Sequence, residues 1–275
     1  EAGSTVEVFV DGSSVGTTTA DGSGSWTFAQ PTDLAEGPHT VTANASDAEG
    51  NTGPDSGEVH FTVDTIAPAA PVISNPADGT HVNVKRPAYS GTAEAGSTVE
   101  VFLNGSPIGT VTADAYGHWM YTQPADLADG AYLVKANAKD AAGNASADSA
   151  AVSFAVDTAA PAISGAQLSA NNAYVDVTFS EGIYGTDQGS GAIDKNDLML
   201  IFTPGNGGAS SVEIHDVRKP DAASAETAGA LAGGETVIRV FLTVSGTENG
   251  TGTIEIRPAD AASIFDQAGN AASDL

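Results

Sequence analysis

The sequence predicts an all-β chain of tandem β-sandwich domains, and two observations lead to this prediction. Residues 1–68 align without a gap on residues 94–161, with 41 identities in 68 positions, which indicates a duplicated domain. Within each copy, short stretches with apolar residues at every second position are separated by Gly, Asn and Pro. Several strands at this spacing, with no amphipathic helical stretch, favour a β-sandwich.

The alternation locates the expected strands of the second copy. Asn104-Gly105 separates the first two of them, and this dipeptide supplies the positive φ values that a type I′ hairpin requires. Trp26 and Trp119 occupy equivalent positions in one strand, so we expect both to be core aromatic side chains. The strands are expected at residues 98–103, 109–113, 119–122, 132–136 and 151–156.

A recurring hinge marks the domain boundaries. Residues 63–68 (Val-Asp-Thr-Ile-Ala-Pro) recur 93 positions later as residues 156–161 (Val-Asp-Thr-Ala-Ala-Pro). Each copy ends a strand-like run and begins a Pro-bearing segment that cannot continue a sheet ladder. Two hinges predict three domains in an extended rod, at residues 1–65, 66–158 and 159–275.

The third segment is not a copy of the others, but it keeps their strand-like alternation. Two loose stretches interrupt it, Gly182–Asp194 and Lys219–Glu235, and the Ala-rich part of the second, Asp221–Ala232, is expected to hold a short helix. Strands are predicted at residues 174–179, 197–202, 211–217, 236–244 and 251–257.

Both ends of the sequence are expected to fall inside domains. By the repeat offset, the first domain lacks the counterpart of residues 66–93, which should carry the first two strands, and the third lacks its closing strand. We therefore expect an excerpt of a longer chain. The alternative is that a neighbouring chain supplies the missing strands, so that copies associate laterally or by strand exchange.

The charge of the chain excludes several classes of partner. The net charge is −26, with only nine basic residues, so nucleic acid and anionic membrane surfaces are not expected partners. No apolar run approaches the roughly 18 residues that a membrane span needs, so no membrane insertion is expected in this segment. An acidic surface of this kind is expected to attract cations.

Carboxylates recur at positions that the topology should bring together. In a seven-stranded sandwich, the connections after the second and sixth strands lie at the end where the chain enters. Each domain has a glutamate after its second-strand region and an Asp-x-x-Gly-Asn loop before its last strand. The expected groups, each with its linker aspartate, are Asp64, Glu94 and Asp140 in the second domain and Asp157, Glu181 and Asp266 in the third.

These groups predict calcium sites at the junctions. Three carboxylates at one pole repel one another unless a cation lies among them, and Ca²⁺ prefers hard oxygen ligands. Glu1 and Asp47 would belong to a further site, whose linker aspartate would lie upstream. The alternative interpretation is that each Asp-x-x-Gly-Asn is only a tight turn, with Asp capping it and Gly taking positive φ.

Several motifs mark residues 1–161: Gly91–Val99, Gly-His-Trp at 117–119, Leu127–Tyr132, Asp140–Asn144 and the hinge at 156–161. Together they resemble the bacterial immunoglobulin-like repeats of giant, type I secreted surface adhesins. Residues 162–275 resemble a related Ig-like module through Val177–Gly185 and Ile264–Asn270. The resemblance implies Ig-like β-sandwiches, an extracellular location at the bacterial cell surface, and a stalk whose junctions Ca²⁺ makes rigid.

The sequence therefore predicts a structural stalk or spacer of an adhesin or extracellular fibre, whose partners are neighbouring Ig-like domains of the same chain. The alternative is a binding module that grips a glycan or host protein with loops 182–194 and 219–235. An enzyme is not expected, because no credible nucleophile, general-acid pair or His-rich metal cluster is present. Gly12–Gly16 formally matches Gly-x-Ser-x-Gly, but that motif needs a strand-to-helix turn.

Overall fold

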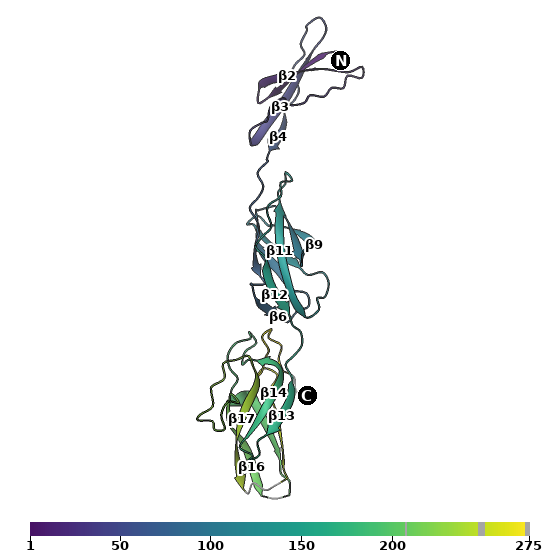
Figure 1. Cartoon of the computed structure of the whole chain (residues 1–275). Coiled ribbons are helices and arrows are strands. Elements are labelled where there is room, and N and C mark those ends of the chain that lie inside the picture. The colour runs from purple at the N-terminus through teal and green to yellow at the C-terminus, as the bar shows by residue number, and fades with distance from the viewer. Residues whose placement is uncertain (207, 247–250, 273–275) are drawn as a thin grey trace.

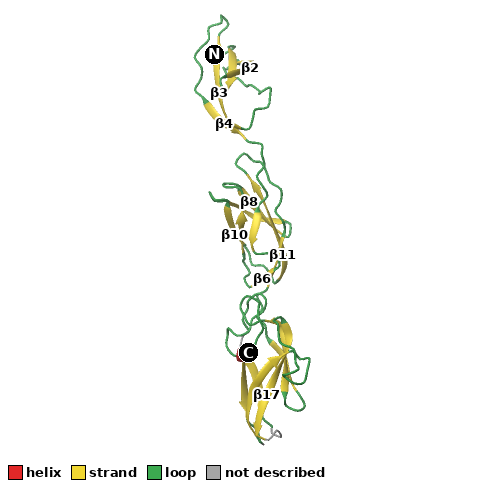
Figure 2. Cartoon of the chain, turned by 90° about the vertical axis from the view of Figure 1, so that its left-hand side faces the viewer, coloured by secondary structure: helices red, strands yellow, loops and turns green. Residues whose placement is uncertain are grey.

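The computed structural model describes residues 1–206, 208–246 and 251–272, and its regular structure is almost entirely β-strand (Figure 1). The strands form three groups that follow one another along a line in both views (Figure 2). We call them repeat one (residues 1–65), repeat two (residues 66–158) and domain three (residues 159–275). The predicted all-β fold with domains in tandem is confirmed.

Repeat two is a sandwich of two sheets. One sheet has the strand order β10-β7-β5, and the other has the order β6-β12-β11-β8-β9, in which only the β6–β12 pair is parallel. The strands are β5 (Val72–Asn75), β6 (Thr80–Val82), β7 (Ala88–Thr92), β8 (Thr98–Leu103), β9 (Ser106–Thr112), β10 (His118–Thr122), β11 (Gly130–Lys139) and β12 (Val152–Val156).

The core of repeat two lies between these sheets and follows from the alternation in the sequence. In β12, Val152, Phe154 and Val156 are buried while the residues between them are not. Burying each such side chain contributes roughly 1.5–3 kcal/mol. Trp119 of β10 is only 3% exposed, so its predicted place in the core is confirmed.

The predicted hairpin turn is also confirmed. Asn104 and Gly105 join β8 to β9 with φ values of 49° and 81°, the left-handed pair that a type I′ turn needs. Asp11 and Gly12 form the same turn in repeat one, with φ values of 49° and 73°.

Repeat one is a single sheet of order β2-β1-β3-β4, which matches β9-β8-β11-β12 of repeat two. The counterpart of β10, residues 25–29, does not form a strand, because β10 pairs with β7 and residues 1–65 contain no counterpart of β7. The strands are β1 (Thr5–Val10), β2 (Ser13–Thr19), β3 (Gly37–Ser46) and β4 (Val59–Val63).

The prediction that Trp26 is a core residue is wrong. Its side chain is 42% exposed, against 3% for Trp119 at the equivalent position. The difference arises because the sheet that covers Trp119 in repeat two has no equivalent over repeat one.

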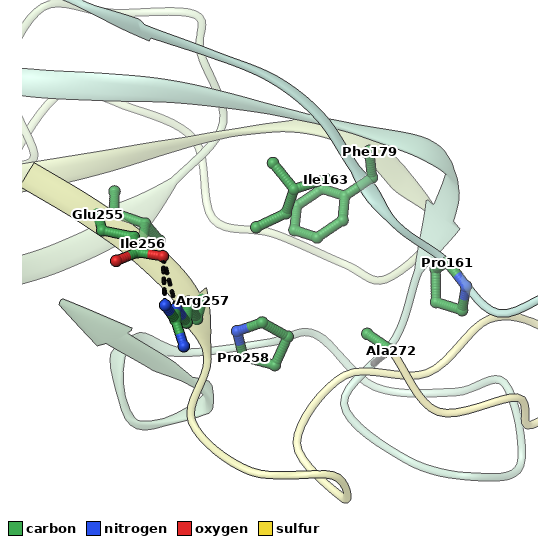
Figure 3. Close-up of a pocket in the computed structure, with 8 residues that line it drawn as sticks. All are labelled: Pro161, Ile163, Phe179, Glu255, Ile256, Arg257, Pro258 and Ala272. Atoms are coloured by element: carbon green, nitrogen blue, oxygen red, sulfur yellow. Dashed lines mark hydrogen bonds and ion pairs between the residues drawn. The ribbon is translucent and has the colours of Figure 1, made fainter. Parts of the chain in front are cut away.

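Domain three pairs a sheet of order β13-β14-β17-β16 with a two-stranded sheet, β15-β18. Within the described residues β18 pairs with β15 alone, and a hollow lies beside it, between Ile163 and Phe179 on one side and Ile256 on the other (Figure 3). The elements are β13 (Ile163–Leu168), β14 (Tyr174–Ile183), the 3₁₀ helix η1 (Lys195–Asp197), β15 (Leu198–Thr203), β16 (Ala209–Arg218), β17 (Glu235–Gly246) and β18 (Thr253–Pro258). None of the helices in the described ranges is long and apolar enough to cross a membrane.

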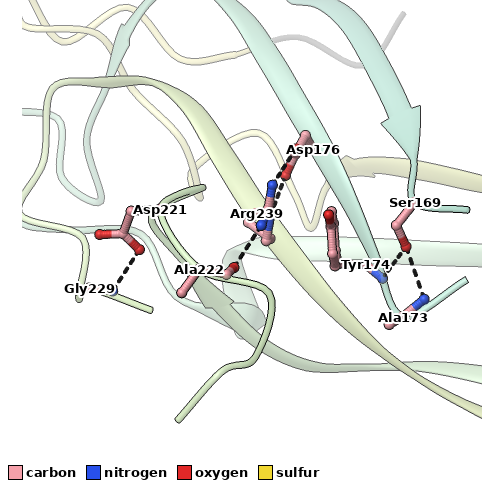
Figure 4. Close-up of polar contacts among 8 residues, drawn as sticks. All are labelled: Ser169, Ala173, Tyr174, Asp176, Asp221, Ala222, Gly229 and Arg239. Carbon is pink, nitrogen blue, oxygen red and sulfur yellow. Dashed lines mark hydrogen bonds and ion pairs between the residues drawn. The ribbon is translucent and has the colours of Figure 1, made fainter. Parts of the chain in front are cut away.

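The short helix predicted in Asp221–Ala232 is wrong, because that segment forms turns held by side chains. Asp221 accepts a hydrogen bond from the backbone of Gly229 at 2.9 Å, and Arg239 of β17 donates to the carbonyl of Ala222 at 2.6 Å (Figure 4). These local bonds hold the backbone away from helical geometry more strongly than alanine propensity favours it.

Arg239 fastens this loop to the sheet. Its guanidinium donates to both oxygens of Asp176, at 2.6 and 2.7 Å, and lies 3.7 Å from the centroid of the Tyr174 ring (Figure 4). The hydrogen bonds to Asp176 raise the pKa of Arg239, so the group stays charged. The arrangement uses the planar fork of arginine, which lysine does not have.

Replacing Arg239 with lysine is therefore expected to destabilise domain three by about 2 kcal/mol, because at least one charge-assisted hydrogen bond is lost. The matched control is Arg257→Lys, since Arg257 pairs with Glu255 at the surface. Thermal unfolding measures stability, and cleavage after Glu226 by a glutamate-specific protease reports release of the loop. Equal stability of the two variants would contradict the anchoring role.

Candidate metal centre at the domain junction

The three Asp-x-x-Gly-Asn loops have the same hydrogen-bonded geometry. In each, the aspartate carboxylate accepts from both the backbone N and the side-chain Nδ2 of the asparagine, at 2.7–2.8 Å. The glycine takes positive φ, 88°, 103° and 86° in chain order. Each loop therefore has the capped-turn geometry that the alternative interpretation assigns to it, and two of the loops make contacts beyond the turn.

The asparagine of two loops also binds the linker that leads into its own domain. Asn144 donates from Nδ2 to the carbonyl oxygen of Asp64 at 3.0 Å, and Asn270 donates to the carbonyl oxygen of Asp157 at 2.8 Å. We call this contact the asparagine latch. The alternation and charge pattern of the sequence do not predict this contact, although the recurrence of Asn with Asp in all three loops is a visible signal of it.

The residue after each latched aspartate is held by the domain that precedes the linker. Thr65 donates from its backbone and side chain to Glu36, and Thr158 donates in the same way to Asp129. Glu36 and Asp129 are repeat equivalents, 93 positions apart. Each linker is thus fixed to the domain before it by its threonine and to the domain after it by the latch.

The second junction also brings three carboxylates together. Oxygen atoms of Asp157, Glu181 and Asp266 all lie within 4.8 Å of one another. Asp157 comes from the linker after β12, Glu181 from the end of β14, and Asp266 from the latch loop. Asp266 is completely buried and the other two are partly buried. This is the group that the sequence predicts for the third domain.

The proximity of the other two carboxylates affects the protonation of Glu181. Burial, together with the charges of Asp157 and Asp266, raises the pKa of Glu181 to about 7. A carboxyl group with this pKa is partly protonated at neutral pH, because ionising it would place a third negative charge in the group. The group can therefore accept a proton or a cation.

A hydrogen bond from repeat two reaches the latch loop of domain three. Asn83, just after β6, donates from Nδ2 to the carbonyl oxygen of Gly269 at 3.4 Å, whereas the backbone N of Asp157 donates to the carbonyl of Val82 at 3.0 Å and so ties the linker to repeat two itself. Asn83 was also missed by the sequence analysis. The junction therefore places the carboxylates between surfaces of both domains.

The first junction has the latch without the carboxylate group. Asp64, Glu94 and Asp140 do not form a comparable cluster among the described residues. Glu94 is exposed in a turn after β7, where its carbonyl accepts from Ser97, whereas Glu181 lies inside β14 beside a register irregularity. The linker is also longer, with eight residues between β4 and β5 against six between β12 and β13.

The two residues expected at a further site lie in repeat one. Glu1 is exposed and its carbonyl accepts from Ser4, while Asp47 caps its own loop. They are not part of a three-residue group among the described residues. Their role as ligands, like that of Asp64, Glu94 and Asp140, stays a prediction.

The comparisons with known proteins place this fold in a family. A model described as bacterial Ig-like domain matches residues 1–65 and 74–158, more than half of the sequence, so the chain belongs to the bacterial Ig-like domain family. The predicted resemblance and the Ig-like β-sandwich class are confirmed. No curated protein matches the chain.

Solved structures with some likeness include fibronectin(III)-like modules and a tandem repeat. The fibronectin(III)-like modules of Clostridium thermocellum CbhA have 18% identity over 57% of this chain and 79% of theirs, with a TM-score of 0.38. The BSP domain of a biofilm associated protein has 28% identity over 57% of this chain and 25% of its own, with a TM-score of 0.25. A tetra-tandem repeat in the extending region of a large adhesion protein has 17% identity over 99% of this chain and 65% of its own, with a TM-score of 0.30. At these TM-scores the likenesses carry no conclusion about function.

The raised pKa of Glu181 predicts the sign of a pH effect in metal-free protein. The folded state binds a proton that the unfolded state has released above its ordinary pKa of 4.5, so stability is lost as pH rises from about 4.5 through 7. Subtracting the profile of Glu181→Gln isolates this contribution. Carbon NMR of the Glu181 carboxyl in chelator should give a midpoint near 7, and a midpoint near 4.5 would contradict the crowded site.

Proposed function

We propose that the chain is a spacer in the stalk of a bacterial cell-surface adhesin or extracellular fibre, and that Ca²⁺ bound by Asp157, Glu181 and Asp266 fixes the angle at its second junction. The observation that carries this proposal is the meeting of these three carboxylates between two domains, with oxygen atoms within 4.8 Å. The linear order of the domains in Figure 1 supports the spacer role.

The three residues fit a calcium ion. Ca²⁺ binds oxygen ligands at 2.3–2.6 Å, so ligands on opposite sides of the ion stand about 5 Å apart. The spacing of the group lies within this limit. Asp266 is completely buried, and Asn270 donates hydrogen bonds to both of its carboxylate oxygens. These contacts fix one carboxylate at the site.

Each residue has a distinct task in this proposal. Asp266 is held by its own loop, Glu181 is held by β14, and Asp157 belongs to the linker that leaves repeat two. A bound cation would remove the repulsion among them and hold the linker to domain three. The angle between the domains then depends on the ion, because the linker can no longer turn freely about the latch.

The energy involved is modest and is suited to stiffening rather than folding. Extracellular calcium modules bind with dissociation constants of roughly 10⁻⁴–10⁻³ M. At about 1 mM calcium this adds on the order of 0.4–1.4 kcal/mol per site.

Small-angle scattering of the whole chain tests the proposal, first with about 2 mM calcium and then with chelator. Calcium is expected to lengthen the maximum dimension and sharpen the distance distribution, and Glu181→Gln should remove this response and lower affinity at least about tenfold, since a charged ligand is lost. Glu213→Gln is the matched control, because Glu213 is an exposed glutamate of β16 in the same domain and belongs to none of the predicted ligand groups.

Calorimetry on the same proteins determines the number of sites. One calcium per chain would indicate the second junction alone. Two, with one lost in Glu94→Gln or Asp64→Asn, would extend the proposal to the first junction. No binding together with an unchanged scattering profile would contradict calcium stiffening and leave the three loops as turns.

The binding-module alternative stays a prediction. It assigns a glycan or host-protein ligand to loops 182–194 and 219–235 of domain three. Glycan screening of the whole chain separates the two proposals, because a spacer should bind none, whereas a binding module should lose its signal when these loops are substituted.

A further inference from the structure

His39 of β3 has a hydrogen-bond acceptor at each of its ring nitrogens. Nδ1 lies 2.7 Å from a carboxylate oxygen of Asp11, and Nε2 lies 2.8 Å from the carbonyl oxygen of Ala35. A neutral imidazole has one N–H, whereas the imidazolium has two, and neither a carboxylate nor a carbonyl oxygen can donate. Both contacts can therefore be hydrogen bonds only when His39 is protonated.

Repeat two makes the same connection with a neutral group. Tyr132 stands 93 positions after His39, and its hydroxyl donates to the carbonyl oxygen of Ala128, the counterpart of Ala35, at 2.9 Å. A phenolic hydroxyl carries its proton throughout the neutral range of pH. Tyr132 makes this contact in a complete sandwich of two sheets, so an opposing sheet does not displace it.

The partner of the ring differs between the repeats in the same sense. Asp11 and Asn104 occupy equivalent hairpin turns, and each accepts at 2.9 Å from a backbone N, that of Thr40 in repeat one and that of Leu133 in repeat two. The second carboxylate oxygen of Asp11 binds the His39 ring. Repeat one thus has an ion pair where repeat two has an amide and a phenol.

The carbonyl that His39 binds belongs to the loop that holds the first linker. Ala35 precedes Glu36, whose carboxylate accepts hydrogen bonds from the backbone N and the hydroxyl of Thr65. When His39 loses a proton, the carboxylate of Asp11 retains the N–H at Nδ1, because that bond joins the ring to a charged acceptor. The lone pair of Nε2 then faces the carbonyl oxygen of Ala35, and the bond to the loop is lost.

The surroundings of the ring include few kinds of ionisable side chain. The ring is 10% exposed, and Phe61 of β4 packs against it with a centroid separation of 5.7 Å. His60 of β4 lines the same surface hollow as His39 and Asp11. The loop that contains Ala35 also carries Asp33 and Glu36, both acidic, so the local charge favours a protonated ring.

The same contacts set the direction of the pH effect. The hydrogen bond to Ala35 and then the contact with Asp11 raise the pKa of His39 above its ordinary value of 6.5, against the opposing effect of partial burial. The folded state therefore holds its proton to a higher pH than the unfolded state. The stabilisation is complete below about pH 6.5 and is lost as pH rises through the raised pKa.

We propose that Asp11, His39 and Ala35 form a pH-dependent clasp that stiffens the first junction when His39 is protonated and loosens it when His39 is neutral. The clasp acts at the junction where Asp64, Glu94 and Asp140 form no carboxylate group among the described residues. It is independent of the calcium proposal, because none of its three residues belongs to the Asp157 group.

Nitrogen NMR of the histidine rings in the whole chain tests the geometry, in chelator and from about pH 5 to about pH 9. We expect both ring nitrogens of His39 to be protonated at the acidic end and the midpoint to lie above 6.5. On deprotonation Nε2 should lose its proton while Nδ1 keeps it. Asp11→Asn should move the midpoint to lower pH, because the charge that faces the ring is removed.

Distances between spin labels in the same chain test the junction. The sequence has no cysteine, so Thr17→Cys in β2 and Thr110→Cys in β9 place one label on each repeat at equivalent exposed positions. The distribution of distances should broaden as pH rises, with the midpoint of the His39 titration. Asp11→Asn alone should shift this broadening to lower pH together with the pKa of His39.

The matched control is the double variant Asp11→Asn with His39→Tyr, which gives repeat one the side chains of repeat two. Its label distances should stay narrow across the whole range, because the phenol can bind Ala35 as Tyr132 binds Ala128. His60 and the acidic residues of the loop are retained in this variant, so their titration is controlled. Circular dichroism checks that the variants fold.

Three results would overturn the proposal. They are a His39 midpoint at or below 6.5, a label distribution that does not change through that midpoint, and an equal broadening in the double variant. The ring titration needs no substitution, so it decides whether the clasp exists even if a variant does not fold.

Discussion

Each sheet of this protein has one apolar face, and the structure depends on whether that face is covered. Alternation of apolar and polar residues makes the face, but only a second sheet removes it from water. Repeat two meets this requirement, with Val99, Val134 and Phe154 buried between its sheets. Repeat one matches repeat two at 41 of 68 aligned positions, but residues 1–65 contain no counterpart of β5 and β7, so the equivalent tryptophan is buried in repeat two and exposed in residues 1–65.

This dependence explains how far sequence could predict the fold. The Asn104-Gly105 turn was predictable, because its φ values depend on those two residues alone. The exposure of Trp26 was not, because burial depends on strands that lie far away in the sequence or outside residues 1–65. The supposed helix at Asp221–Ala232 failed for a similar reason, since Arg239 reaches the loop from β17.

The candidate site was predictable to the extent that topology decides it. Asp157, Glu181 and Asp266 meet because a linker, a second strand and a penultimate loop share one end of a sandwich. Asp64, Glu94 and Asp140 occupy similar topological positions, yet they do not form the same group. Whether a glutamate lies within the strand or in the turn after it depends on register, which the repeat alignment does not reveal for the unrelated third domain.

The asparagine latch has a consequence for how such chains can evolve. Asn144 and Asn270 donate to main-chain carbonyl oxygens of the linkers, which every residue type possesses. The latch itself therefore demands little of the residue that it binds, and it operates both between two repeats that share 41 of 68 aligned positions and between repeat two and a module of different sequence. Gene segments that encode such modules can therefore be shuffled, gained or lost without redesign of the connection. The number of modules, and with it the length of the chain, can change readily during evolution.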